Sequence, residues 1–164
     1  HPPLDHAERQ IRLLQVREKI GGIHCALQVF SLDACPAFVT LSYVWGHPDT
    51  QYDITLNGRR FLVRQNLYAA LYHIAKHIAL RGFEPHVSAR EAETQPSVIA
   101  NPSLDTVDPT KRLPNCWKYI WIDALCINQE HISERNPQVR LMSEIHKSAT
   151  FVLVWLGSHC ETAL

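Results

Sequence analysis

The alternation of apolar and polar residues predicts several strands in the first half of the chain. Residues 11–16 form a short apolar run, and residues 23–30 alternate apolar with polar positions, which is the period of a half-buried strand. Residues 38–45 are almost continuously apolar or β-prone, which favours a strand covered on both faces. We therefore expect three strands in this part of the chain.

A hairpin and a helix are expected next. Residues 54–63 favour a β-hairpin, because Asn57 and Gly58 both tolerate the positive φ that a two-residue turn requires. Asn66 can then cap a helix that ends at Gly82. The apolar residues of this helix recur at helical spacing and define the face expected to be buried: Leu67, Leu71, Ile74 and Ile78.

The last third of the chain predicts the succession strand, helix, strand. The apolar run at residues 119–127 predicts a strand and the turn that leaves it. Asn136 before Pro137 fits the N-cap and the first helical position of a helix within residues 133–149. One apolar stripe follows on that helix: Val139, Met142, Ile145 and Ala149. Residues 150–157 then predict a second buried strand.

This order of elements predicts the α/β class. A strand–helix–strand unit whose apolar runs are too continuous for a one-sided sheet favours a parallel core. We expect a single domain over residues 1–164, with its core at about residues 11–157 and a loop-rich, proline-containing insertion at about residues 83–115. Because the chain starts with His1 and stops just after a strand-like run, we expect an excerpt of a longer protein.

The composition gives no sign of a nucleic-acid or membrane partner. Sixteen basic residues balance 16 acidic ones, and no apolar run approaches the roughly 20 residues that a membrane helix needs. The five cysteines are scattered without metal-ligand spacing, which favours reduced thiols in a cytoplasmic protein. His73 and His77 share a helical i, i+4 spacing, but no third ligand lies nearby, so no metal site is expected.

Polar residues follow the apolar runs expected at the centre of the sheet. Because ligands of such sheets bind beyond the carboxyl ends of the strands, these residues are candidates for one binding rim. The candidate ligand-binding residues are Ser42, Tyr43, Trp45, Gly46, Asp123, Cys126, Asn128 and Gln129. A structural role explains them equally well: Asp123 can cap a turn, and Trp45 can lie in the core. The spacing leaves both interpretations open.

Five segments carry a resemblance to a known family: 41-LSYVWG-46, 66-NLYAAL-71, 121-WIDALCINQ-129, 134-ERNPQVRLM-142 and 153-LVWLG-157. In this order they closely resemble the fungal heterokaryon incompatibility (HET) domain, and the resemblance covers nearly the whole chain. Within these segments, the residues to which we assign a motif or structural role are Glu134, Gln138, Met142, Trp155 and Gly157.

The resemblance implies a function and a fold. HET domains trigger programmed cell death when genetically different fungal cells fuse. They are remotely similar to Toll/interleukin receptor (TIR) domains of innate immunity, which implies a flavodoxin-like sandwich with a mainly parallel central sheet, here with an extra N-terminal β-hairpin region. Some TIR domains hydrolyse NAD at the nicotinamide–ribose bond with a glutamate just beyond the third strand. By this comparison NAD is a possible substrate, no cofactor is permanently bound, and Glu161 is the candidate catalytic residue.

Three hypotheses follow. In the first, the domain is a death-inducing enzyme that hydrolyses NAD. In the second, it is a non-enzymatic signalling module that associates with itself or with other death-signalling proteins. In the third, Ser42, Asp123 and Gln138 form one buried polar network that binds no ligand.

Overall fold

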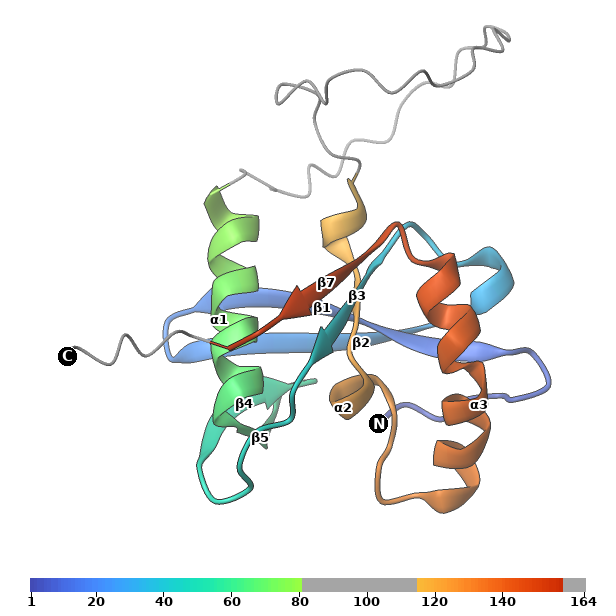
Figure 1. Cartoon of the computed structure of the whole chain (residues 1–164), viewed down its shortest axis with the longest axis horizontal. Coiled ribbons are helices and arrows are strands. Elements are labelled where there is room, and N and C mark those ends of the chain that lie inside the picture. The colour runs from blue at the N-terminus through green and yellow to red at the C-terminus, as the bar shows by residue number, and fades with distance from the viewer. Residues whose placement is uncertain (81–114, 158–164) are drawn as a thin grey trace, which may run out of the picture.

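The computed structural model describes residues 1–80 and 115–157 and is a mixed α/β fold (Figure 1). Its strands are β1 (Gln10–Lys19), β2 (Gly22–Ser31), β3 (Val39–Tyr43), β4 (Gln51–Leu56), β5 (Arg59–Arg64), β6 (Ile120–Trp121) and β7 (Phe151–Trp155). Its helices are α1 (Gln65–Leu80), α2 (Asp123–Cys126) and α3 (Ile132–Ser148), with two 3-10 turns at Leu32–Ala34 and Asn115–Lys118. The predicted insertion at residues 83–115 lies almost wholly outside the described residues.

The described strands form one sheet in the order β5-β4-β2-β1-β6-β3-β7. The pairs β1–β2, β1–β6 and β4–β5 are antiparallel, whereas β2–β4, β3–β6 and β3–β7 are parallel. The α/β class is confirmed, but the prediction of a mainly parallel sheet is wrong. Two tight turns make consecutive strands neighbours, which forces antiparallel pairing. The N-terminal hairpin is part of the sheet, and parallel pairing dominates only at β6-β3-β7.

The predicted hairpin turn at Asn57-Gly58 is confirmed. Both residues have positive φ, at 49° and 76°, as the turn between β4 and β5 requires. Asn57 also binds the neighbouring strand: its backbone N–H donates to the Cys25 carbonyl (2.9 Å), and its Oδ1 accepts from the Leu27 N–H (2.8 Å). The turn therefore fixes β4 beside β2 as well as closing the hairpin.

Helix α1 begins one residue earlier than predicted. Gln65 is its first residue, so Asn66 lies inside the first turn and the prediction that Asn66 is the N-cap is wrong. Leu67, Leu71 and Ile74 are buried as expected. The Asn66 side chain instead binds the ends of β3 and β7, as described below.

Helix α3 also begins before its predicted start. It runs from Ile132 with His131 as its N-cap residue, so Pro137 lies within the helix and the prediction of an Asn136 N-cap is wrong. Two polar residues, Glu134 and Gln138, are among its buried positions. The buried contacts of Glu134 stabilise the first turn of the helix, because Glu134 accepts hydrogen bonds from Arg12 and from the Asn128 N–H. The predicted apolar stripe is only partly correct: Ile145 is fully buried, but Val139 is 51% exposed.

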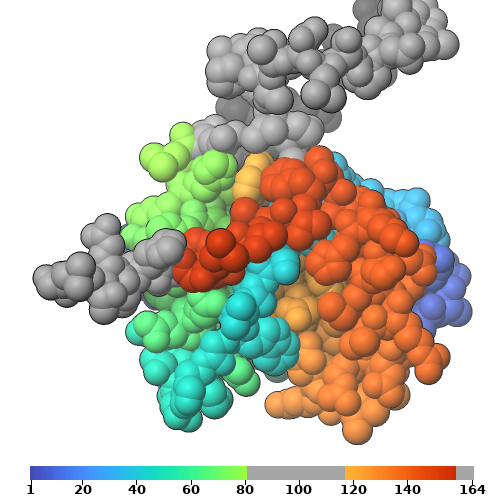
Figure 2. Space-filling view, in the orientation of Figure 1, coloured from blue at the N-terminus to red at the C-terminus, as the bar shows by residue number. Residues whose placement is uncertain are grey.

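The strands of the last third are shorter and less covered than predicted. Strand β6 has two residues, because the backbone N–H groups of Leu125 and Cys126 turn back to the Ile122 carbonyl and start α2. Strand β7 is the last strand in the order and exposes Val152 and Val154, so the prediction that it is buried on both faces is wrong. Figure 2 shows β7 at the surface, beside α3.

Helices α1 and α3 cover opposite faces of the parallel strands. His146 of α3 hydrogen-bonds Thr40 Oγ1 in β3 at 2.9 Å. Thr40 is the register partner of Val152, whereas Trp155 lies on the other face of β7 and contacts His73 of α1 at 5.1 Å between ring centroids. In Figure 1 the two helices flank β3 and β7 on either side.

Candidate functional site

The carboxyl ends of β6, β3 and β7 lie along one edge of the sheet, because these strands are parallel neighbours. We call the segments that follow them, residues 43–46, 123–129 and 155–157, the rim. The convergence expected from the sequence is therefore present. Polar side chains from each segment cross-link the rim.

Asp123 joins two of the three segments. Its Oδ2 accepts a hydrogen bond from Trp45 Nε1 (3.2 Å), and its Oδ1 accepts one from the Ala124 N–H (2.7 Å). Its backbone carbonyl accepts from Gln129 Nε2 (2.9 Å). Asp123 thus positions the Trp45 ring and fixes the start of α2, while its carboxylate stays partly exposed at the surface.

Asn66 joins the segments that follow β3 and β7. Its Nδ2 donates to the Val44 carbonyl (2.5 Å), and its Oδ1 accepts from Trp155 Nε1 (2.9 Å). Gly46 and Gly157 both have positive φ and both lie close to Asn66: a Cβ at these positions would be 3.3 Å from Asn66 Cβ and 3.6 Å from Asn66 Oδ1. The two glycines therefore allow the strand ends to approach this side chain.

A pocket of about 180 Å³ opens beside the rim. It is lined by Tyr43, Trp45, Gln51, Phe61, Leu62, Val63, Arg64, Leu67, Ala124, Leu125 and Gln129. Arg64 lies 5.3 Å from the centre of the Trp45 ring and donates from Nη1 to the Gly46 carbonyl (2.9 Å). Burial, followed by the charge of Asp123, raises the pKa of Tyr43 against the smaller opposing effect of Arg64, so Tyr43 is a neutral hydroxyl at physiological pH.

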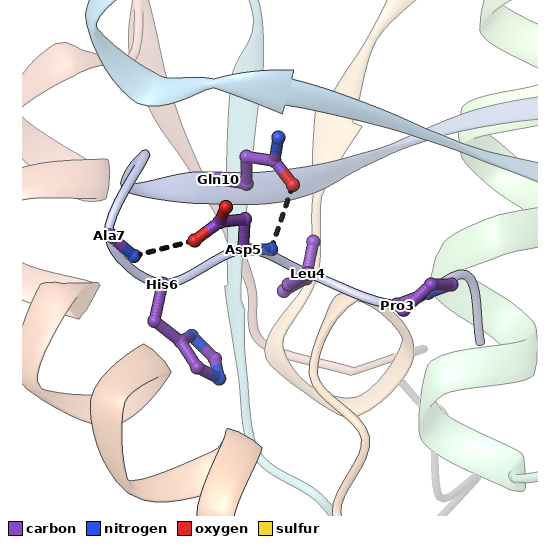
Figure 3. Close-up of a pocket in the computed structure, with 6 residues that line it drawn as sticks. All are labelled: Pro3, Leu4, Asp5, His6, Ala7 and Gln10. Atoms are coloured by element: carbon purple, nitrogen blue, oxygen red, sulfur yellow. Dashed lines mark hydrogen bonds between the residues drawn. The ribbon is translucent and has the colours of Figure 1, made fainter.

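A second hollow lies along the N-terminal segment and is lined by Pro3, Leu4, Asp5, His6, Ala7 and Gln10 (Figure 3). All its lining residues come from one short stretch of chain. Its polar groups also bind one another: the Asp5 N–H donates to Gln10 Oε1, and the Ala7 N–H donates to Asp5 Oδ1, both at 2.9 Å. It is a weaker candidate than the rim pocket, where several elements converge.

Comparison with known proteins finds similarity to one family. The family model described as Heterokaryon incompatibility protein (HET) matches residues 86–164. The chain is also 29% identical, over 94% of its length, to Heterokaryon incompatibility protein 6, OR allele, of Neurospora crassa. The chain is therefore similar to HET domains at residues 86–164 and to a heterokaryon incompatibility protein over nearly its whole length. It spans about a fifth (20%) of the length of the Neurospora protein, and no solved structure matches it.

The fold brings together some of the residues predicted to bind a ligand. Tyr43, Trp45 and Gln129 line the pocket, and Asp123 binds Trp45 beside it. Gly46 holds Arg64 through its carbonyl. These residues remain ligand-binding candidates.

Three predicted ligand-binding residues lie apart from the pocket. Ser42 is exposed and is not part of the pocket lining. Cys126 is fully buried and is not part of the pocket lining, and burial raises the pKa of its thiol to about 12. The Asn128 side chain accepts from the Glu130 N–H in its own loop (3.3 Å), which is a turn-stabilising contact.

The motif residues stabilise the fold in different ways. Glu134 pairs with Arg12, and Gln138 Nε2 donates to the Gln10 carbonyl (2.8 Å), so both anchor α3 to β1. Met142 and Trp155 are partly buried against the core. The predicted buried network of Ser42, Asp123 and Gln138 is wrong, because these residues have different partners and Ser42 is exposed. The predicted catalytic Glu161 lies outside the described residues.

Two residues of the site were not identified from the sequence, Arg64 and Asn66. Arg64 ends a strand that is antiparallel to its neighbour, so the rule for parallel strand ends does not point to it. Asn66 was interpreted as a helix cap. The sequence feature that could have identified Arg64 and Asn66 is their position where the hairpin meets the helix, since polar side chains there can face a neighbouring loop.

Within residues 1–80 and 115–157, no group of three or more His, Cys, Asp or Glu side chains is placed to hold a metal ion. His73 and His77 contact aromatic rings instead, those of Trp155 and Trp117. No helix in this part of the chain is long and apolar enough to cross a membrane.

Proposed function

We propose that this chain is a HET domain, a cell-death effector of fungal heterokaryon incompatibility, and that its rim cleaves NAD at the nicotinamide–ribose bond. The first part is supported by the family match and by the name of the Neurospora relative. The second part is supported by the geometry of the rim pocket. It agrees with the resemblance of the family to TIR domains.

The observation that carries the enzymatic proposal is the position of the Asp123 carboxylate beside the aromatic wall of the pocket, 3.2 Å from Trp45 Nε1. Loss of nicotinamide leaves positive charge on the ribose, and a nearby carboxylate stabilises such a centre. An aromatic ring can hold a planar base. Trp45 and Asp123 supply these two groups side by side.

The size of the pocket limits how much of an NAD molecule it can enclose. A volume of about 180 Å³ is below the roughly 300–1,000 Å³ of pockets that enclose drug-sized ligands. It suits one ring or one small group, and the rest of a dinucleotide would lie along the exposed rim. The neutral Tyr43 hydroxyl and the Gln129 amide, both in the lining, can hydrogen-bond such a ligand.

The test is release of nicotinamide from NAD by the purified, concentrated domain. We expect turnover by the wild type and its loss in Asp123→Asn, which removes the charge and keeps an acceptor for Trp45. Glu130→Gln is the matched control, because Glu130 is an exposed carboxylate immediately after the same rim segment. Glu161→Gln tests the other candidate carboxylate. No release at high concentration, including from an assembled form, would reject the enzymatic proposal.

A specific observation also favours the second candidate, a module that associates with itself. Strand β7 ends the strand order, and Val152 (43%) and Val154 (60%) are exposed along it, followed by the exposed Leu156 (84%) just after its end. Its five residues include no charge and no proline, the features that usually protect an edge strand. A second copy could add its own β7 to this edge. Concentration-dependent sedimentation that Val154→Lys abolishes would support this interface, whereas a monomer at all concentrations would rule it out.

A further inference from the structure

Arg64 differs from Arg9 and Arg12 in having no carboxylate partner among the described residues. Arg12 pairs with Glu134 at 2.6 Å, and Arg9 pairs with Glu144 at 2.6 Å. Within the described residues, the contacts of Arg64 are the Gly46 carbonyl and the Trp45 ring. A guanidinium has five N–H donors, and one carbonyl uses few of them.

The surroundings of Arg64 add no negative charge within the pocket. Among the described residues that line the pocket, Arg64 is the charged one and the others are apolar, aromatic or amide side chains. The nearby carboxylate, Asp123, is already bound to Trp45 Nε1 and the Ala124 N–H. The described lining itself therefore carries the positive charge of Arg64, while the negative charge of Asp123 lies beside it.

The start of α1 increases this positive potential. The helix begins at Gln65, immediately after Arg64, and is 16 residues long. The partial positive charge of its first turn lies beside the pocket, because Leu67 from that turn is part of the lining. A half-buried cation next to a helix N-terminus favours an anionic ligand group.

We propose that Arg64 binds a phosphate group of the ligand at the rim pocket, with its planar fork directed at the phosphate oxygens. Trp45 holds the guanidinium on one face, and the Gly46 carbonyl fixes its orientation. This assignment deepens the proposed function, since the diphosphate of NAD would be the natural anion. It does not depend on bond cleavage, because binding and turnover can be measured separately.

Equilibrium binding by calorimetry tests the proposal, with ADP-ribose, inorganic pyrophosphate and adenosine as probes. We expect ADP-ribose to bind the wild type and to bind Arg64→Gln about 10- to 100-fold more weakly, the range for loss of a charge-assisted contact. Adenosine, which has no phosphate, should bind both proteins equally. Arg64→Lys should bind ADP-ribose with intermediate affinity, because it keeps the charge and loses the fork.

Arg60→Gln is the matched control. Arg60 is on the same strand, but it is exposed and pairs with Asp53 at 2.5 Å, away from the pocket lining. Its substitution should leave ADP-ribose affinity unchanged. Pyrophosphate that binds as tightly as ADP-ribose would identify a site for free phosphates, whereas much weaker binding would identify a nucleotide site.

Three results would overturn the proposal. The first is equal ADP-ribose affinity in the wild type and in an Arg64→Gln variant whose melting temperature is unchanged. The second is an absence of ADP-ribose and pyrophosphate binding to the wild type at millimolar concentration. Arg64-dependent binding without nicotinamide release would leave this proposal standing and reject only the enzymatic one. A lower melting temperature together with lost adenosine binding would show that Arg64 only stabilises the loop, and would also reject the proposal.

Discussion

Arg12 and Glu134 form a two-pronged ion pair between β1 and α3, with Nη1–Oε1 and Nη2–Oε2 distances of 2.6 and 2.8 Å. Arg12 is fully buried, and the Glu134 side chain is 10% exposed. Arg12 also donates to the carbonyls of Pro2 and Cys126, and Glu134 accepts from the Asn128 N–H. The pair therefore connects the N-terminal segment, the central strand and the end of the rim.

Removing one partner of this pair should destabilise the fold strongly. We expect Glu134→Gln to lower the free energy of unfolding by about 3–5 kcal/mol, because it leaves the Arg12 charge buried without a counter-charge. The double variant Arg12→Met/Glu134→Met should be more stable than the summed effects of the two single substitutions predict. Urea denaturation monitored by circular dichroism measures both.

The exposed pair of Arg60 and Asp53 is the control for that experiment. Arg60→Gln should change the urea midpoint little, since both side chains lie in solvent. An unchanged midpoint for Glu134→Gln would contradict the structural importance assigned to the buried pair.

The pH dependence of stability should report the same pair. Burial raises the pKa of Glu134, but the hydrogen bond from Arg12, the Asn128 N–H and the Arg12 charge together outweigh it, so the pKa lies below its usual value of 4.5. A pKa lowered on folding gives stability that is fully present above the unfolded value and is lost as the pH falls through the folded value. The stability difference between wild type and Glu134→Gln should therefore be largest above pH 5 and shrink in acid. A difference that is constant from pH 7 to pH 3 would contradict this assignment.

Local patterns in the sequence predicted those features that depend on neighbouring residues. The Asn57-Gly58 turn needs only positive φ at two adjacent positions, and both have it. The convergence of the rim followed from β6, β3 and β7 being apolar runs with polar ends. The order of the sheet did not follow, because β1 and β2 lie between the β4–β5 hairpin and the parallel strands.

Features that depend on distant partners were the ones missed. The buried face of α3 is predicted from its apolar residues, yet Glu134 is also buried because β1, more than 100 positions away in sequence, supplies Arg12. Arg64 and Asn66 belong to the candidate site for the same reason. A polar residue at a buried helical position resembles a solvated one until its partner is known.

Asn66 provides a test of how the rim is held together. Asn66→Ala should lower the free energy of unfolding by about 1–2 kcal/mol, since it removes two hydrogen bonds. Asn66→Asp tests the two hydrogen bonds separately, because a carboxylate still accepts from Trp155 Nε1 but cannot donate to the Val44 carbonyl. Hydrogen exchange measured by NMR should then be faster for the amides of residues 44–46 and unchanged for the Trp155 indole. If Asn66→Asp changed the exchange rates of the residue 44–46 amides and of the Trp155 indole to the same extent, Asn66 would not connect the two sites.

Gly46 and Gly58 form a matched pair for the last prediction. Their φ values are 74° and 76°, so alanine meets the same backbone strain at each, about 1–2 kcal/mol. A Cβ on Gly58 would have no neighbour within 4 Å, whereas one on Gly46 would lie 3.3 Å from Asn66 Cβ. Gly46→Ala should therefore cost about 1 kcal/mol more than Gly58→Ala in urea denaturation, as expected for crowding in a packed site. It should also weaken ADP-ribose binding, because the Gly46 carbonyl orients Arg64, while Gly58→Ala should not. Equal stability and equal affinity for the two variants would mean that the close approach of Gly46 to Asn66 does not shape the rim.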